Sequence, residues 1–142
     1  MKSCRTATAF SLIELLIAIT IVGVLTAIAV PGYQNYVLQS ARTAAGACLL
    51  EYAQFMERVY TTNMTYASNN GDDTELPELQ CSIDLAERFS FALDNLDSRS
   101  FTLTATVTGA QADDDCESLS YNQAGIKGAN GGTSATIVKK CW

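Results

Sequence analysis

Hydrophobic and polar positions divide the chain into two unequal parts. Residues 10–30, FSLIELLIAITIVGVLTAIAV, carry a single charge, at Glu14. A helix of this length spans roughly 30 Å, which is the thickness of the hydrocarbon core of a bilayer. The pattern therefore predicts a helix that can cross a membrane. Because Lys2 and Arg5 precede it, the positive-inside rule places the N-terminus in the cytoplasm.

The helical pattern continues beyond this apolar run, but with one apolar face. Between residues 33 and 60 the apolar positions recur at steps of three and four, at Ala45, Cys48, Leu49, Tyr52, Phe55, Met56 and Val59. We expect one long helix from Phe10 to Tyr60, whose second half packs against a globular head. Within it, Pro31 is expected to cause a kink and Gly23 to weaken the helix.

The rest of the chain is typical of a small sheet. Residues 61–80 are rich in turn formers and predict a loop. Three segments read as strands, 89–93, 101–108 and 118–122, and Thr136 to Lys139 predicts a short edge strand. Consecutive strands at these spacings favour an antiparallel sheet, so the expected fold class is α+β.

Composition excludes several classes of function. The chain has 9 Lys and Arg against 15 Asp and Glu, no His, and a formal charge of −6. Without His there is no Ser-His-Asp or Cys-His catalysis and no imidazole ligand for zinc. The negative charge argues against general electrostatic binding to nucleic acid. We therefore expect that the protein is not an enzyme and that it binds neither a cofactor nor a metal ion.

Three interpretations compete for the N-terminal segment. It is a secretory signal peptide cleaved after Ala27-Ile28-Ala29, a plain membrane anchor, or an anchor that is cleaved before its apolar run. Glu14 favours the third. A carboxylate costs on the order of 3 kcal/mol near the centre of a bilayer, and a discarded signal peptide has no use for one.

The residues around Glu14 carry a specific family resemblance. Ala9-Phe10-Ser11-Leu12-Ile13-Glu14, followed by Pro31 and Tyr33, resembles the class III signal of type IV pilins. The resemblance implies that a prepilin peptidase cleaves between Ala9 and Phe10, and that Phe10 is N-methylated. The family usually has Gly at the position of Ala9, but Ala is small enough that we expect processing. The implied division is a leader at 1–9, an assembly and transmembrane helix at 10–37 and a head at 38–142.

The C-terminal part narrows this resemblance to PilE-type minor pilins of gram-negative bacteria. The similar positions are 109–112, Cys116, Leu119-Ser120, 122–125, Lys127 and Cys141-Trp142, and residues 50–58 are also similar. Glu117 departs from the pattern, because the family usually has Gly there. The resemblance implies the type IV pilin fold, in which a long N-terminal helix packs on a small antiparallel sheet and a disulfide closes the C-terminal loop.

The cysteines are consistent with an oxidising compartment. Cys4 lies in the leader, which leaves Cys48, Cys81, Cys116 and Cys141 and three possible pairings. No C-x-x-C occurs, which argues against metal binding. The family's C-terminal loop is commonly closed by its last two cysteines, and each such pair joins neighbouring elements. We therefore expect Cys48–Cys81 and Cys116–Cys141.

The function implied by the resemblance is that of a structural pilus subunit. As a minor pilin it would support pilus biogenesis, twitching motility, adhesion or DNA uptake. Glu14 would pair with the ammonium group of Phe10 in an adjacent subunit, and the region from Gly23 to Pro31 would loosen on assembly. The implied partners are other pilins, the prepilin peptidase and the assembly platform of the inner membrane, where the subunit resides before it enters the extracellular pilus.

Two alternative functions share the same N-terminus. The first is a DNA-receptor pilin for natural transformation, in which Lys127, Lys139 and Lys140 would contact phosphates. Loss of Lys2 and Arg5 with the leader makes the chain still more acidic, which argues against it. The second is a type II secretion pseudopilin, some of which bind calcium. Asp113 to Asp115 invite this comparison, but no EF-hand spacing is present.

Overall fold

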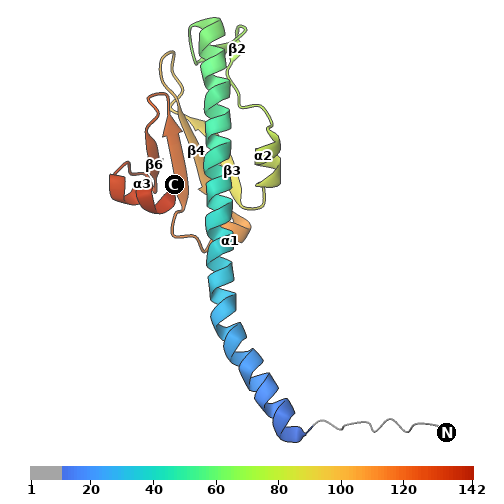
Figure 1. Ribbon diagram of the computed structural model, residues 1–142. Coiled ribbons are helices and arrows are strands. Elements are labelled where there is room, and N and C mark those ends of the chain that lie inside the picture. The colour runs from blue at the N-terminus through green and yellow to red at the C-terminus, as the bar shows by residue number, and fades with distance from the viewer. Residues whose placement is uncertain (1–10) are drawn as a thin grey trace, which may run out of the picture. The chain divides into compact units, whose positions relative to one another are not determined.

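The computed structural model describes residues 11–142 and begins with one long helix. Helix α1 runs from Leu12 to Asn63 and does not end at Pro31, which lies inside it (Figure 1). Its predicted first residue, Phe10, lies outside the described residues. The chain divides into two units, one ending at Val37 and one beginning at Leu38. All buried residues of α1 belong to the second unit, and they are Ala45, Gly46, Cys48, Leu49, Tyr52, Ala53, Met56 and Val59.

A four-stranded antiparallel sheet forms the other layer of the head. Its strands are β3 (Phe89–Asp94), β4 (Thr102–Val107), β5 (Ser118–Asn122) and β6 (Lys127–Ala129), in that spatial order. The register places a row of apolar residues directly opposite one another across the strands. This row is Phe91, Ala105, Leu119 and Ala129. Since side chains alternate along a strand, the row lies on one face of the sheet.

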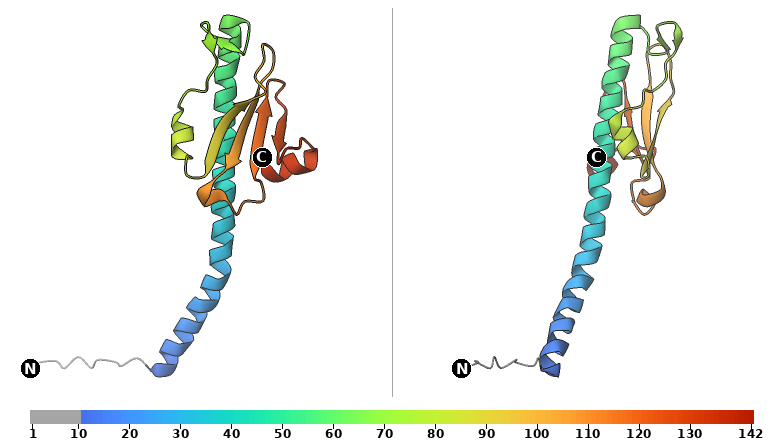
Figure 2. Two further views of the ribbon diagram at one scale, coloured as in Figure 1. Left: turned by 180° about the vertical axis from the view of Figure 1, so that it is seen from behind. Right: turned by 90° about the vertical axis from the view of Figure 1, so that its right-hand side faces the viewer.

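The core lies between this face and the second half of α1. Figure 2 shows the sheet as a layer beside that part of the helix. Leu49 and Met56 of α1 are buried together with Leu103 and Leu119 of the sheet. The rings of Tyr52 and Phe91 approach to 5.6 Å between centroids. The predicted α+β class and the helix-on-sheet arrangement are confirmed.

The segment predicted as a loop contains short regular elements. After α1, a small hairpin forms from β1 (Ser68–Asn69) and β2 (Asp72–Asp73). Its turn residues Asn70 and Gly71 both have positive φ, at 57° and 100°, as a tight two-residue hairpin turn requires. Helix α2 (Gln80–Asp84) precedes β3, and a single 3₁₀ turn, η1 (Gly109–Gln111), follows β4.

The predicted edge strand from Thr136 to Lys139 is wrong. These residues belong to helix α3 (Ala135–Cys141), and the edge strand is β6 instead. The helical spacing turns Ile137 and Cys141 toward the core and leaves Lys139 exposed. In a strand, Ile137, Lys139 and Cys141 would share one face, so that a lysine would be buried with them. The β-branched residues misled the prediction because packing outweighs local propensity.

Two disulfides cross-link segments of the head. Cys48 in α1 is bonded to Cys81 in α2, and Cys116 is bonded to Cys141 at the end of α3. These are the pairs that the family resemblance led us to expect. They close segments with separations of 33 and 25 residues, for which loop-closure estimates give roughly 3–4 kcal/mol each.

Candidate functional site

The most extensive candidate surface is the first part of α1. Between residues 11 and 36 every side chain is exposed, including the large apolar ones such as Leu12, Ile19 and Leu25. A window of this helix has a mean hydropathy of 2.6 and is long and apolar enough to cross a membrane, by length and composition. An apolar patch of this size is not typical of a soluble monomer and points to a lipid or protein environment.

Polar groups on this segment are few and partly satisfied within the helix. The hydroxyl of Thr20 donates to the carbonyl of Ile17 at 2.8 Å, and that of Thr26 donates to the carbonyl of Val22 at 2.8 Å. Such bonds let a hydroxyl enter an apolar medium. Glu14 lies in the first turn of α1 and is exposed. Its carboxylate is therefore the charged group of this surface that needs a partner.

The other predicted residues of the N-terminal segment have simple surroundings. Gly23 lies in the exposed part of α1, and a Cβ atom added there would meet nothing within 4 Å. Pro31 is equally exposed. Ala9 and Phe10, the predicted cleavage site, lie outside the described residues.

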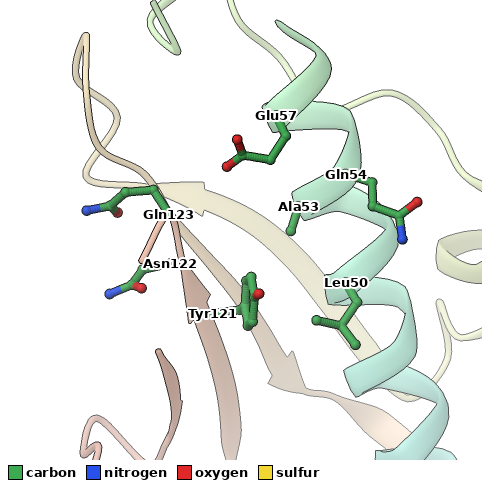
Figure 3. Close-up of a pocket in the computed structure, with 7 residues that line it drawn as sticks. All are labelled: Leu50, Ala53, Gln54, Glu57, Tyr121, Asn122 and Gln123. Carbon is green, nitrogen blue, oxygen red and sulfur yellow. The ribbon is translucent and has the colours of Figure 1, made fainter. Parts of the chain in front are cut away.

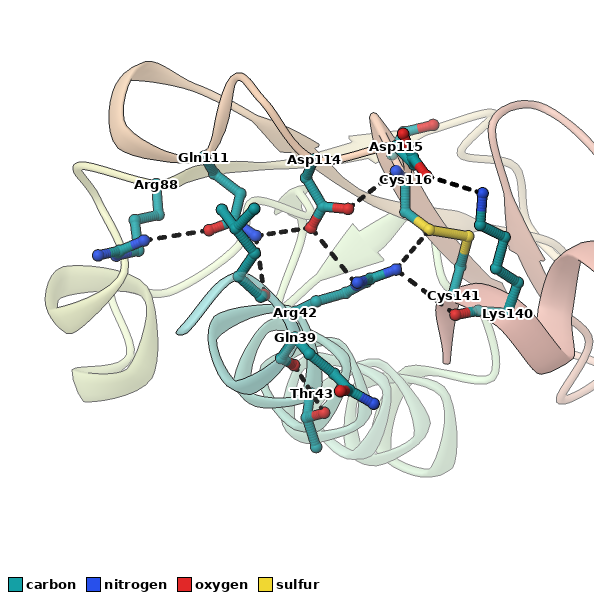
Figure 4. Close-up of polar contacts among 12 residues, drawn as sticks. Gln39, Arg42, Thr43, Arg88, Gln111, Asp114, Asp115, Cys116, Lys140 and Cys141 are labelled. Carbon is teal, nitrogen blue, oxygen red and sulfur yellow. Dashed lines mark hydrogen bonds and ion pairs between the residues drawn. A yellow bond between two sulfur atoms is a disulfide. The ribbon is translucent and has the colours of Figure 1, made fainter. Parts of the chain in front are cut away.

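A second candidate region is a polar cluster between α1 and the loop closed by Cys116 and Cys141. Arg42 extends from α1 so that its Nε lies 3.4 Å from Oδ2 of Asp114. Its Nη1 donates to Sγ of Cys116 at 2.6 Å and to the carbonyl of Lys140 at 3.5 Å (Figure 4). The two charged side chains are almost withdrawn from solvent, with 13% and 2% of their surfaces exposed.

Gln111 completes this cluster. Its Nε2 donates to the carbonyl of Leu38 in α1 at 2.9 Å and to Oδ2 of Asp114 at 2.6 Å, and its Oε1 accepts from Nη1 of Arg88 at 3.2 Å. The other oxygen of Asp114 accepts from the backbone N–H of Cys116. We call Arg42, Gln111 and Asp114 the polar clamp. Sequence reasoning missed it because Gln111 is 73 residues from Leu38, the residue of α1 that it contacts.

The predicted DNA-contacting lysines lie at the edge of the sheet formed by β6 and α3. Lys127 is in β6, and its Nζ lies 4.5 Å from the centroid of the Trp142 ring. Lys140 is paired with Asp115 at 3.0 Å, and this contact holds the pKa of the Asp115 carboxyl below its usual value. Lys139 is exposed on α3. The structure therefore brings the three lysines to one edge and pairs Lys140 with an acid.

Two shallow hollows flank α1 in the head. One, of about 380 Å³, has Leu50 and Ala53 on its helical side and Tyr121 on its sheet side, whereas the amides of Asn122 and Gln123 point away from α1 (Figure 3). The other, of about 230 Å³, lies between α1 and Trp142. In neither do charged groups converge as they do around a reactive centre.

The acidic run from Asp113 to Asp115 does not form a cation site. Asp114 turns inward to Arg42, and Asp115 turns outward to Lys140. Among residues 11–142, no group of three or more His, Cys, Asp or Glu side chains could hold a metal ion.

Comparison with protein families gives two matches that together cover residues 4–120. Residues 31–120 match the model described as "Type IV minor pilin ComP, DNA uptake sequence receptor". Residues 4–30 match the prokaryotic N-terminal methylation motif.

Known proteins that this chain resembles include a type IV fimbrial protein and a type IV pilin. The type IV major fimbrial protein FimA of Dichelobacter nodosus is 45% identical over 53 residues, which are 30% of this chain and 34% of that protein. The chain thus matches about a third of the length of this curated relative. A type IV pilin structure from Shewanella oneidensis has 27% identity to this chain and a TM-score of 0.50. The superposition covers 69% of this chain and 98% of the Shewanella chain.

A further solved structure supports the fold alone. The non-core minor pilin PilV of Neisseria meningitidis has 22% identity and a TM-score of 0.52. The superposition covers 70% of this chain and 93% of that one.

Proposed function

Since this chain belongs to the family of type IV minor pilins described by the ComP model, we propose that it is a pilus subunit that assembles through the first part of α1. The matched family and the similar structures are those of structural proteins. The head would contribute filament surface. The subunit would support pilus biogenesis, motility, adhesion or DNA uptake and perform no catalysis.

One observation carries this proposal. Every described residue before Val37 is exposed, and most of the side chains are apolar. Apolar side chains in such number require lipid or other helices around them. The subunit would reside in the inner membrane first, with its N-terminus in the cytoplasm, and then exchange lipid for the helices of neighbouring pilins in the extracellular filament.

Maturation provides the partner for Glu14. Cleavage between Ala9 and Phe10 by a prepilin peptidase would remove the leader at 1–9 and create an N-methylated ammonium group. In the filament this group of one subunit would pair with the Glu14 carboxylate of the next, which offsets the cost of burying both charges. The assembly platform would receive the processed subunit. Loosening of α1 between Gly23 and Pro31 would accompany its entry.

The test is Glu14→Ala in the full chain. We expect the variant to be expressed, inserted and cleaved, but to be lost from sheared pili, because the ammonium group has no carboxylate to meet. Glu51→Ala is the matched control, since Glu51 is an exposed acid on the second half of α1. Normal amounts of Glu14→Ala in pili would contradict the proposal.

A second candidate function is recognition of DNA, which is what the name of the matched family states for its members. The distribution of charge favours one location. From residue 118 to 142 the chain has three lysines and no Asp or Glu, and all three lie at the β6 and α3 edge. Between Arg58 and Arg88, by contrast, there are acids and no Lys or Arg. DNA would therefore bind at the edge formed by β6 and α3, where these three lysines lie.

Gel-shift titration of the full chain in uncharged detergent tests this candidate. We expect binding that weakens steeply with salt, and a smaller salt dependence for Lys127→Ala with Lys139→Ala. Arg58→Ala with Arg99→Ala, which removes two exposed charges elsewhere, is the control. Absence of a shift at low salt would exclude DNA recognition while leaving the subunit role intact.

A further inference from the structure

The head begins at Leu38 of α1, which is half-buried. Before this residue no described side chain of α1 is buried, and a Cβ atom added at Gly23 or Gly32 would meet no side chain or other element within 4 Å. No contact with the head opposes unwinding there, so the helix depends on its own hydrogen bonds and on the medium around it. Since helix formation is cooperative, an unwound segment in this part can extend until tertiary contacts stop it.

The polar clamp makes its contacts at this boundary. The carbonyl of Leu38 belongs to the hydrogen-bond ladder of α1. With its second lone pair it also accepts a hydrogen bond from Nε2 of Gln111 at 2.9 Å. One turn later, Arg42 of the same helix reaches Asp114 and Cys116. The helical turn from Leu38 to Arg42 is therefore held at both of its ends by the loop between β4 and β5.

The members of the clamp have no alternative partners in solvent. Gln111 is fully buried, and both its amide nitrogen and its oxygen are engaged. Asp114 accepts from Gln111 and from the backbone of Cys116 while it faces Arg42. Unwinding of the turn would leave a buried amide and a buried carboxylate without their partners on α1. Such groups are costly to leave unpaired.

We propose that the polar clamp fixes the point at which α1 can lose helical structure, so that unwinding in residues 11–37 stops at Leu38. Arg42, Gln111 and Asp114 are positioning residues for this turn. The value of such a stop to an assembling subunit rests on the proposed function, because it lets the membrane part of α1 rearrange while the head stays folded. The stop itself is a property of the chain alone.

Hydrogen exchange of the full chain in detergent micelles tests the proposal. Gln111→Met keeps the length of the side chain but removes its donors and acceptor. We expect amides of residues 38–46 to exchange roughly tenfold faster or more in this variant, while those of β4 stay protected. Gln54→Met is the matched control, since Gln54 is exposed on the same helix, and it should change neither segment.

Two results would overturn the proposal. Unchanged exchange at residues 38–46 would show that the clamp does not hold the turn. An equal rise in β4 would show that Gln111 supports the head as a whole. If Gln111→Met does not fold, Asp114→Asn, which retains the shape but loses the charge facing Arg42, should give the same local rise. None of these measurements needs pili, so their failure is distinct from that of the Glu14 experiment.

Discussion

The two halves of α1 belong to one uninterrupted helix, yet they are built for different surroundings. Before Val37 most side chains are apolar, and none that the structure describes is buried. After Leu38 only one face is apolar, and it is covered by the sheet. The comparison teaches that two parts of one helix need not share a common source of stability. The second half is stabilised by the head, and the first depends on what surrounds it.

The largest expected effect comes from truncating a leucine in each half. Leu49 is 1% exposed in the core, whereas Leu16 is 46% exposed. Leu49→Ala should lower the free energy of unfolding of the head by about 2–5 kcal/mol, because it leaves a cavity. Leu16→Ala should change it by less than about 0.5 kcal/mol.

Denaturant unfolding followed by the fluorescence of Trp142, which is the single tryptophan, measures both variants. Comparable losses in the two would mean that the halves share one cooperative unit, and would break the comparison.

A smaller effect is expected from adding a side chain to one glycine in each half. A Cβ atom on Gly46 would lie 3.3 Å from two ring carbons of Trp142, whereas one on Gly23 would meet nothing within 4 Å. Gly46→Val should therefore destabilise the head by about 1–3 kcal/mol through overpacking.

Gly23→Val should leave the head unaffected and stiffen the first half, since Val disfavours a helix less than Gly does. The same fluorescence measurement applies, and Gly46→Val should also shift the emission of Trp142. A head that tolerates Val at position 46 would show that the contact with Trp142 is loose.

The smallest effect concerns a buried tyrosine beside the end of α1. Burial, and then the hydrogen bond of its hydroxyl to Glu57 at 2.8 Å, raise the pKa of Tyr66 to about 12. The folded pKa thus exceeds the ordinary value of about 10. The stability that Tyr66 contributes is present below pH 10 and is lost as the pH rises from about 10 to about 12.

Alkaline titration of tyrosinate absorbance should show a late-titrating group that Tyr66→Phe removes. The variant should also lose about 1 kcal/mol of stability with the hydrogen bond. Persistence of the late group in Tyr66→Phe would assign it to another tyrosine.

Periodicity predicted the elements whose pattern is long and regular. The amphipathic face from Ala45 to Val59 is buried except for Phe55, which is half-buried, and the alternation around β4 marks a strand of the sheet. Short elements were missed because a few residues carry little periodic signal. Helix α2 has five residues, and β6 has three with Gly128 at its centre.

The candidate site was predicted unevenly for a different reason. Glu14 stands out because a charge within an apolar run is costly wherever the run is placed. The clamp does not stand out, because Arg42, Gln111 and Asp114 are ordinary polar residues until folding brings them together. Arg42 is not among the residues of the apolar face that the periodicity predicts, yet it contacts a buried acid from a distant loop.

The contact between Arg42 and the carbonyl of Lys140 joins residues 98 positions apart. At the usual pace of synthesis, about 5–20 residues per second, Lys140 follows Arg42 by roughly 5–20 s. Cys141 and Trp142 come later still, although the first closes a disulfide and the second covers Gly46. The apolar face of α1 is therefore covered completely only after nearly all of the remaining polypeptide has been synthesised.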